Sequence, residues 1–445
     1  MSLIGDKTYV GFGLGAIQSG LFLYEALESG AFERLVVAEV LPDTVRRVRD
    51  NDGYLTVNIA HTDHIRASRI GPIEIYDPAV DADRQQLIEA VAAAHEIGTA
   101  VPGTRFYGSP GPESLCRILA TGLKVKAEMG GPRAVIYAAE NHNHAAEILE
   151  ELVLTEIPPT EYGAVCNCVR FLNTVIGKMS GVITGNTDIK ALYLTPITPD
   201  NDRAFLVEAF NRILISRIGF VEGNGEPVFQ RGITTFIEKD DLLPFEEAKL
   251  FGHNATHALA AYIGALLGVK RIADLPSVPG IMKFLRQAFI EESGAALIHR
   301  YSGLDSLFTP EGYAVYADDL LTRMCNPWLA DAVDRVGRDV ERKLGWDDRL
   351  IGTLRLGLAE GVIPCRYALG AAAAMVFLDP SYLSDDADPA GRLLVLWDQS
   401  ERDPAQKNDV LALIREGMRH LRQWVSASPH DSLALVAKYD PDLTR

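Results

Sequence analysis

The sequence predicts an α/β fold with a doubly wound parallel sheet in its first part and a second, mostly α-helical domain after it. Two observations predict this arrangement. In the first part, short apolar runs typical of buried strands alternate with segments of helical apolar spacing, the pattern of parallel strands joined by helical crossovers. After about residue 240 the strand-like runs stop, and longer segments with helical spacing follow.

The first part alternates between the two patterns from its beginning. We expect strands at Tyr9–Gly13, Leu35–Val40, Ile73–Tyr76, Ile97–Val101 and Ala134–Ala139, with helices that include Leu21–Leu27, Leu87–Ala94 and Pro112–Met129. The later helices are expected at Phe245–Leu267, Val278–Glu292, Pro310–Arg323, Leu329–Leu344, Arg349–Leu358 and Asn408–Ser426. We therefore expect an α/β domain over 1–240 and a helical domain over 241–445.

Composition and charge exclude several classes of protein. The 445 residues carry 43 Lys and Arg against 60 Asp and Glu, a net charge of −17. An excess of carboxylate disfavours binding to nucleic acid or to anionic lipid, since both need cationic side chains. Asp6 and Lys7 interrupt the apolar core that a signal peptide needs, and the five cysteines are too few for a disulfide framework. We expect a cytoplasmic protein that binds neither nucleic acid nor membrane.

A glycine-rich turn follows the first expected strand. Gly13, Gly15 and Gly20 lie between that strand and the next helix, where a Rossmann-like domain binds the pyrophosphate of a dinucleotide. In the register that begins at Gly13, Gln18 replaces the third glycine of the fingerprint. Glu39 ends the second strand, where a carboxylate binds the adenosine ribose and repels a 2′-phosphate, so the pattern favours NAD over NADP. Thr99 is a further candidate at the end of a later strand; a purely structural glycine turn is the alternative.

Three polar residues fall toward one side of an expected helix in the second domain. At about 100° per residue, Asn254 lies roughly 140° and His257 roughly 80° around the helix from Lys249. A lysine whose pKa is lowered by burial or by neighbouring cations is able to take a hydroxyl proton, and an asparagine amide is able to stabilise the alkoxide. An exposed lysine with helix-satisfied neighbours is the alternative, and His253 competes with His257 on this face.

These residues and several other segments resemble one enzyme family. The spacing of Lys249, Asn254 and His257 resembles the signature of the polyol-specific long-chain dehydrogenases, the mannitol dehydrogenase family. The strand end that closes on Asn141 resembles a strand-end motif of the same family. Its mannitol-1-phosphate 5-dehydrogenase branch is resembled by the segments that contain Glu291–Ala295, Asn326–Pro327, Asp334–Arg338, Arg342–Leu344 and Asp348–Ile351. The similarity runs from about residue 8 to about residue 378.

The resemblance implies a fold, a cofactor and residue roles. Lys249 is implied as the general base, Asn141 and Asn254 as donors to the substrate oxyanion, His257 as the residue that orients the substrate oxygen and Glu246 as an acid that exchanges the proton with solvent. It also implies NAD as the hydride acceptor and no metal. Arg335 and Lys343 match substrate-contacting positions. Gly177 and Lys178 stand where relatives carry Asp-Arg, and this departure leaves the substrate open, with Lys178 as a candidate to contact it.

Other charged clusters have open interpretations. Arg338, with Arg335, Arg342 and Lys343, forms either a phosphate-binding group or a solvated helix face paired with acids. Two histidine pairs, His61 with His64 and His142 with His144, have no third ligand at a recognisable metal-site spacing, so polar loops are favoured. Cys166 and Cys168 are expected to be buried structural thiols.

These expectations combine into one hypothesis and two alternatives. We expect an NAD-dependent oxidoreductase that interconverts a secondary alcohol of a hexitol or hexitol phosphate with the ketose, in a cleft between the two domains. Its partner would be a small sugar alcohol or its phosphate, and the chain would be a monomer or a small homo-oligomer. A keto-uronate or aldonate reductase of the same family and a non-catalytic dinucleotide-binding regulator are the alternatives.

Overall fold

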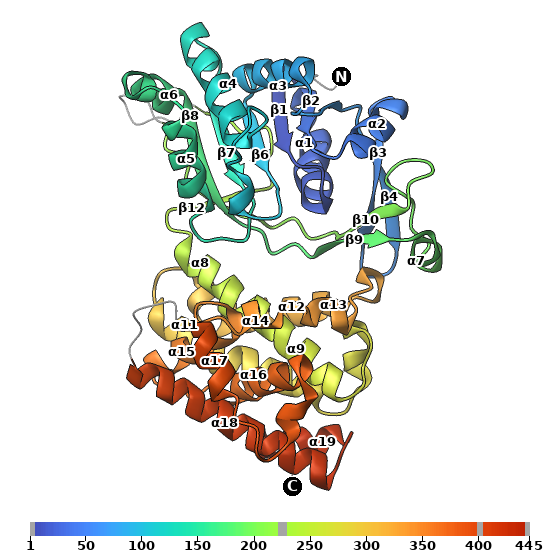
Figure 1. Cartoon of the computed structure of the whole chain (residues 1–445), viewed down its shortest axis with the longest axis vertical. Coiled ribbons are helices and arrows are strands. Elements are labelled where there is room, and N and C mark those ends of the chain that lie inside the picture. The colour runs from blue at the N-terminus through green and yellow to red at the C-terminus, as the bar shows by residue number, and fades with distance from the viewer. Residues whose placement is uncertain (1–4, 221–228, 398–403, 441–445) are drawn as a thin grey trace. The chain divides into compact units, whose positions relative to one another are not determined.

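The computed structural model describes residues 5–220, 229–397 and 404–440. The chain forms two compact units, Met1–Leu243 and Pro244–Arg445 (Figure 1).

The first unit is built on a largely parallel sheet, as the sequence predicts. Its described strands form an eight-stranded sheet in the order β12-β11-β8-β7-β6-β1-β2-β5. The strands are β1 (Lys7–Phe12), β2 (Phe32–Ala38), β5 (Glu74–Tyr76), β6 (Glu96–Thr99), β7 (Ala134–Ala138), β8 (Val169–Val175), β11 (Leu214–Ser216) and β12 (Ile237–Lys239). The six from β8 to β5 run parallel, and β11 pairs antiparallel with β8. The α/β fold class is therefore confirmed.

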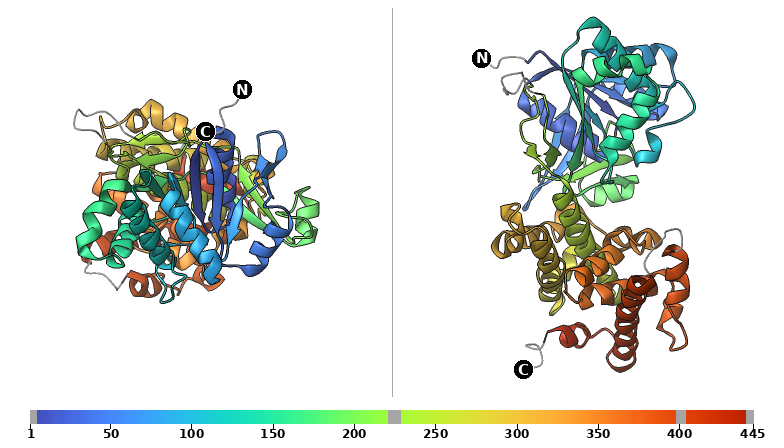
Figure 2. Two further views of the ribbon diagram at one scale, coloured as in Figure 1. Left: turned by 90° about the horizontal axis from the view of Figure 1, so that it is seen from above. Right: turned by 90° about the vertical axis from the view of Figure 1, so that its left-hand side faces the viewer.

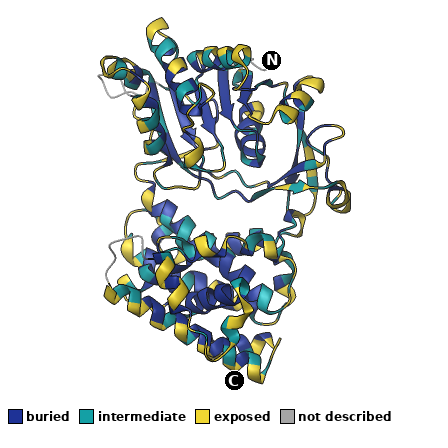
Figure 3. Ribbon diagram, viewed as in Figure 1, coloured by how far each residue is buried: buried dark blue, intermediate teal, exposed yellow. Residues whose placement is uncertain are grey.

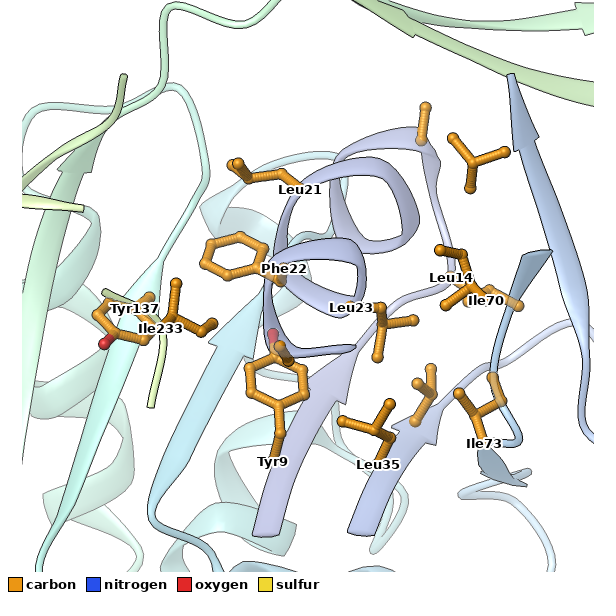
Figure 4. Packing of buried hydrophobic residues seen from close by; sticks show 14 of the residues in the cluster. Tyr9, Leu14, Leu21, Phe22, Leu23, Leu35, Ile70, Ile73, Tyr137 and Ile233 are labelled. Atoms are coloured by element: carbon orange, nitrogen blue, oxygen red, sulfur yellow. The ribbon is translucent and has the colours of Figure 1, made fainter. Parts of the chain in front are cut away.

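Helices connect and cover these strands. They are the π-helix η1 (Gln18–Leu23) continued by α1 (Tyr24–Ser29), then α2 (Pro42–Asp50), α3 (Asp81–Ala93), α4 (Leu115–Met129), α5 (Ala145–Thr155), α6 (Tyr162–Cys168) and α7 (Asn186–Ala191). Apolar side chains of η1 pack on β1 and β2, where Phe22 and Leu23 lie over Tyr9 and Leu35 (Figure 4). This packing fixes the position of the glycine turn that precedes the helix.

A second, four-stranded sheet belongs to the same unit and is absent from the sequence prediction. Its order is β4-β3-β10-β9, formed by β3 (Leu55–Ala60), β4 (Ile65–Ile70), β9 (Ser180–Thr184) and β10 (Arg203–Glu208). The strands β3 and β10 pair in parallel although they lie far apart in the chain. Both contact η1, so this sheet covers a side of the first helix that the main sheet leaves open.

The second unit is helical. Its α- and π-helices are α8 (Leu243–Glu247), η4 (Ala248–Asn254), α9 (Ala255–Leu266), α10 (Ile281–Gln287), η6 (Ala288–Gly294), α11 (Ala295–Arg300), α12 (Pro310–Met324), α13 (Val333–Gly337), α14 (Val340–Lys343), α15 (Arg349–Ala359), α16 (Cys365–Leu378), α17 (Ala390–Trp397), α18 (Pro404–Ala427) and α19 (Ser432–Val436). The helices α9 and α16 pack on each other and are buried along most of their length (Figure 3). The long helix α18, at the red end of the chain, covers α16 (Figure 2).

The expected helix over Leu329–Leu344 is wrong in one respect, because the structure divides it. Ala330 and Asp339 adopt left-handed backbone conformations, with φ of 54° and 57°, and neither conformation continues an α-helix. Two short helices, α13 and α14, result, and Arg338 lies in the turn between them. The break places the side chain of Arg338 at an exposed corner instead of on a helix face.

Candidate active site

The glycine turn lies at the carboxyl end of β1, where parallel sheets bind nucleotides. Gly13 has a φ of +85°, which favours glycine, and its amide donates to the carbonyl of Ala38 at 2.8 Å. A Cβ atom added to Gly15 would have no neighbour within 4 Å, so the backbone there is open to a closely approaching group.

Gln18 and Gly20 lie inside the helix–sheet interface. Gln18 is fully buried, and its Nε2 donates to the hydroxyl of Tyr9 at 2.8 Å. A Cβ atom on Gly11 would come within 2.0 Å of that Nε2, so Gly11 provides the room that a third fingerprint glycine usually provides. Gly20 packs against Val207, because a Cβ atom added to Gly20 would lie only 2.6 Å from Cγ1 of Val207. Gly20 therefore allows close packing on β10.

Glu39 follows β2 and Thr99 ends β6, the two strands on either side of β1, but the two side chains have different surroundings. The two carboxylate oxygens of Glu39 accept from the amides of Leu14 (2.7 Å) and Leu41 (2.9 Å), which ties Glu39 directly to the glycine turn. Thr99 is fully buried, and its hydroxyl donates to Glu140 at 2.8 Å. This buried hydrogen bond links the end of β6 to the segment that follows β7.

Glu140 is a residue that the sequence reasoning did not select. Its buried carboxylate accepts from Thr99, from the amide of Val101 at 2.9 Å and from the hydroxyl of Tyr107. Burial raises the pKa of Glu140, against the hydrogen bonds that lower it. The next residue is Asn141, which is exposed after β7. Glu140 therefore fixes the backbone from which Asn141 projects.

Lys178 is a buried structural lysine in this unit. Its ammonium donates to the carbonyls of Glu208 and Phe210 and to Oδ1 of Asn211. These three acceptors match the three donors of an ammonium group. The amine is therefore committed to the loop that follows β10.

In the second unit, a π-helical turn gathers the polar residues on one face. Lys249, His253 and Asn254 all belong to η4, and the amide of Ala255 reaches back to the carbonyl of Leu250, five residues earlier. Because a π-turn is wider than an α-turn, residues four and five apart come closer to one face than the 100° spacing predicts. The turn thus brings Asn254 nearer to Lys249 than the sequence argument placed it.

The charges around Lys249 favour its neutral form. Burial and the guanidinium of Arg349 lower the pKa of Lys249 to about 8, although the carboxylate of Glu246 opposes this. Glu246 is itself buried, one turn before the lysine. An amine with a pKa near 8 is neutral often enough at physiological pH to accept a proton.

Both histidines near Lys249 have lowered pKa values. Burial, with Arg335, Arg349 and Lys343, lowers the pKa of His257 to about 3. Burial and neighbouring cations lower the pKa of His253 well below its usual value. The two rings lie 6.5 Å apart between centroids, and Nε2 of His257 lies 3.5 Å from Oδ2 of Asp331. The surroundings therefore favour neutral imidazoles beside basic side chains.

A cationic group surrounds these rings. Arg335 pairs with Asp331, and the amine of Lys343 donates to the carbonyl of Arg338. Burial and Arg349 lower the pKa of Lys343 to about 8. Arg338 itself is 69% exposed and makes a distant ion pair of 3.9 Å with Asp339. Of these residues, Arg338 is the most accessible to an anion from solvent.

Arg349 is a second residue that the sequence analysis did not propose for the site. Its positive charge lowers the pKa values of Lys249, His253, His257 and Lys343. Its side chain is 12% exposed, and its Nε donates to Asp348, the residue that caps α15, at 2.8 Å. One turn later, the hydroxyl of Thr353 donates to the carbonyl of Phe251 at 3.1 Å, and Gly352 packs against the ring of Phe251. These contacts hold α15 against η4 and so place Arg349 beside Lys249.

Gly352→Ala should destabilise the second unit. The new Cβ would lie 2.4 Å from Cε1 of Phe251, and overpacking of this kind costs about 1–3 kcal/mol. Gly391→Ala is the matched control, because a Cβ there meets nothing within 4 Å. Thermal unfolding should show a lower Tm for Gly352→Ala alone. Equal Tm values for the two variants would contradict this account of the helix packing.

Among the described residues, no group of three or more His, Cys, Asp or Glu side chains is arranged to hold a metal ion. The rings of His61 and His64 stack at 4.6 Å, and His142 and His144 lie 6.2 Å apart in an edge arrangement. Cys166 and Cys168 are free and partly buried. No helix in the described part of the chain is long and apolar enough to cross a membrane.

Comparison with known proteins identifies the family. The model of the mannitol dehydrogenase Rossmann domain matches residues 7–226, and that of the mannitol dehydrogenase C-terminal domain matches residues 241–418. The chain belongs to the mannitol dehydrogenase family. A relative in this family, mannitol-1-phosphate 5-dehydrogenase of Bacillus licheniformis, is 30% identical over 369 residues, which cover 82% of this chain and 86% of the relative.

Solved structures with the mannitol dehydrogenase fold resemble the whole chain. The ternary complex of Pseudomonas fluorescens mannitol 2-dehydrogenase with NAD and D-mannitol is 17% identical, with a TM-score of 0.71 over 99% of this chain and 95% of that one. A substrate-free D-sorbitol dehydrogenase is 15% identical, with a TM-score of 0.72 over 97% and 95%. These similarities confirm the fold predicted for a member of the mannitol dehydrogenase family.

Proposed function

We propose that this protein is an NAD-dependent oxidoreductase that interconverts a secondary alcohol of a hexitol or hexitol phosphate with the corresponding ketose. The observation that carries the proposal is the state of Lys249: a partly buried amine with a pKa of about 8, on one π-turn with Asn254 and close in the chain to His257. Alcohol oxidation is assisted by a group that accepts the hydroxyl proton and by donors that stabilise the developing alkoxide.

The residues of the first unit fit a dinucleotide. The open backbone at Gly15 suits a pyrophosphate, and the helix that follows offers the amides of its N-terminus. Each carboxylate oxygen of Glu39 keeps a lone pair for a ribose hydroxyl beyond its amide partner, and its charge disfavours a 2′-phosphate. NAD, when bound, would supply the hydride acceptor. We propose Gly13, Gly15 and Glu39 as its ligands, with Thr99 and Gly20 in supporting positions.

The chain's own residues would handle the proton and the developing charge. Neutral Lys249 takes the proton of the substrate hydroxyl, and Glu246, buried beside it, passes that proton toward solvent. The amides of Asn254 and Asn141 donate to the alkoxide as it forms, and they strengthen their hydrogen bonds as charge accumulates. His257 stays neutral and orients a substrate oxygen.

The cationic group suits a substrate with an anionic end. Arg335, Lys343 and Arg349 lie near His257, and Arg338 lies near Arg335. A guanidinium binds phosphate through two parallel hydrogen bonds. Arg338 is the accessible member of the group. We therefore propose a hexitol phosphate as the preferred substrate, while the role of Lys178 is to hold the loop after β10.

Arg338→Ala tests the preference for phosphate. We expect kcat/KM for a hexitol phosphate to fall by about 10–100-fold, equivalent to about 1.5–3 kcal/mol for a charge-assisted hydrogen bond. The kcat/KM for the free hexitol should stay within a few-fold of the wild-type value. Arg392→Ala, another exposed arginine of this unit, is the control. Equal losses on both substrates would contradict a phosphate-binding role.

A substrate panel tests the function itself. Purified protein is incubated with NAD or NADP and with hexitols, hexitol phosphates and aldonates, and reduced cofactor is read by its absorbance. Turnover of hexitols or their phosphates with NAD supports the proposal. Turnover of aldonates alone indicates a keto-uronate reductase, and NAD binding without turnover indicates a regulator; either result would overturn it.

The proposal also includes the cellular compartment, the class of partner and the oligomeric state of the protein. A net charge of −17 and five free thiols support a cytoplasmic enzyme whose partner is a small molecule and not nucleic acid. We propose a monomer or small homo-oligomer, which light scattering of the purified protein would measure.

A further inference from the structure

One buried carboxylate, Asp331, joins an imidazole to a guanidinium. Asp331 is 4% exposed, and its Oδ1 accepts from the guanidinium of Arg335. Its Oδ2 lies 3.5 Å from Nε2 of His257. Within the described part of the chain, neither Oδ2 nor Nε2 has a hydrogen-bond partner, although both are buried. Two unsatisfied buried polar atoms therefore face each other at the site.

The backbone around Asp331 is held in place. The carbonyl of Asp331 accepts from the amide of Ile272 at 2.9 Å, and the carbonyl of Lys270 accepts from the amide of Val333 at 2.9 Å. These bonds form a small antiparallel bridge between Arg271 and Ala332. The carboxylate is thus positioned from two sides, by this bridge and by Arg335.

We propose that Asp331 is a positioning residue for His257, which fixes the proton of the neutral ring on Nε2 and leaves Nδ1 as the acceptor for a substrate hydroxyl. A neutral imidazole has two tautomers, and a carboxylate near one nitrogen favours the tautomer that carries the proton there. The inference rests on the proposed function, because it assigns His257 a hydroxyl-bearing ligand.

The charges around the ring of His257 disfavour its protonation, so the choice between the two neutral tautomers decides which nitrogen donates. Burial, with Arg335, Arg349 and Lys343, lowers the pKa of His257 to about 3. The carboxylate of Asp331 faces the ring from the segment before α13, and His253 lies one turn before it. The ring therefore stays uncharged over the working pH range, and Asp331 controls which nitrogen donates. The ion pair with Arg335 orients the carboxylate.

Asp331→Asn tests this role, since it keeps the shape and removes the charge. Asp334→Asn is the control, because Asp334 is an exposed carboxylate only three residues later. We expect kcat/KM for the polyol to fall by about 10²-fold in Asp331→Asn, the size expected when a reacting group is misplaced, with an unchanged Kd for NAD. In the His257→Ala background, Asp331→Asn should add little. A full additional loss in that background would overturn the proposal.

A second measurement needs no turnover. Nitrogen-15 NMR of the histidine rings distinguishes the two neutral tautomers, and a His257→Asn variant assigns the resonance. We expect the Nε2–H form in the wild type and a shift toward a mixture in Asp331→Asn. A wild-type Nδ1–H form would overturn the proposal even if the variant fails to fold. A failure of the proposed function would instead appear in the substrate panel, with the tautomer unchanged.

Discussion

Lys249→Ala is expected to lower kcat for polyol oxidation by about 10³-fold, within the range that general base catalysis contributes. Without the amine, no group on η4 with a pKa near physiological pH remains to take the hydroxyl proton, because both neighbouring histidines have strongly lowered pKa values. The residues proposed to bind NAD lie in the other unit, so the Kd for NAD should remain close to the wild-type value.

The matched variants separate chemistry from folding. Lys249→Met keeps the apolar stem of the side chain and should lose as much activity as Lys249→Ala, while Lys270→Ala removes an exposed lysine of the same unit and should lose none. Initial rates, Tm and NAD affinity are measured for all three. Wild-type turnover in Lys249→Met would refute the assignment of the base.

The main sheet could be predicted from sequence because its strands are short, apolar and bounded by turn residues. The strand β7 shows this clearly: all five of its residues are buried, and an uninterrupted apolar run of this length is typical of a parallel strand covered on both faces. The second sheet carries no comparable local pattern. Exposed and partly exposed residues dominate β4, and β3 joins β10 through contacts such as that of Asn58 with Phe205, 147 residues apart. Pairing over such a distance depends on tertiary structure.

The candidate site likewise has one part that the sequence shows and another that depends on tertiary packing. The motif that contains Lys249 is visible in the sequence, but its geometry depends on a π-turn that packing produces. Gly252 lies against Tyr313 and Phe289, where a Cβ would come within 2.5 Å of the tyrosine hydroxyl. A uniform helical period cannot reveal such a turn.

Asp331 and Arg349 escaped selection for a related reason. Each acts on a residue more than 70 positions away in the chain, and an acid or arginine on a helical segment looks like a solvated side chain until the fold places it. Lys178 illustrates the reverse case. Its position matched a substrate-contacting segment of the family, but three acceptors of the loop after β10 hold its amine. The sequence pattern identifies which residue types are present, whereas burial and hydrogen bonding decide which of them can contact a ligand.

Arg349→Gln is expected to move the pH dependence of oxidation upward. The wild-type kcat/KM should rise with pH and level off above about 8, because Lys249 must be neutral to accept a proton and its pKa is about 8. Removing the positive charge of Arg349 removes one of the two causes that lower this pKa, so a smaller fraction of the amine is neutral at pH 7. Each unit of upward shift costs about tenfold in rate at that pH.

Glu246→Gln should shift the same profile in the opposite direction, because the carboxylate of Glu246 raises the pKa of Lys249. Arg342→Gln, at a half-exposed arginine on α14, should leave the profile unchanged. Rates are measured from pH 6 to 10 with saturating NAD, and the plateau above the midpoint reports damage unrelated to titration. Opposite shifts for Arg349→Gln and Glu246→Gln are expected for a titrating group that lies near both this cation and this anion, as Lys249 does. Shifts in the same direction would assign the profile to some other group.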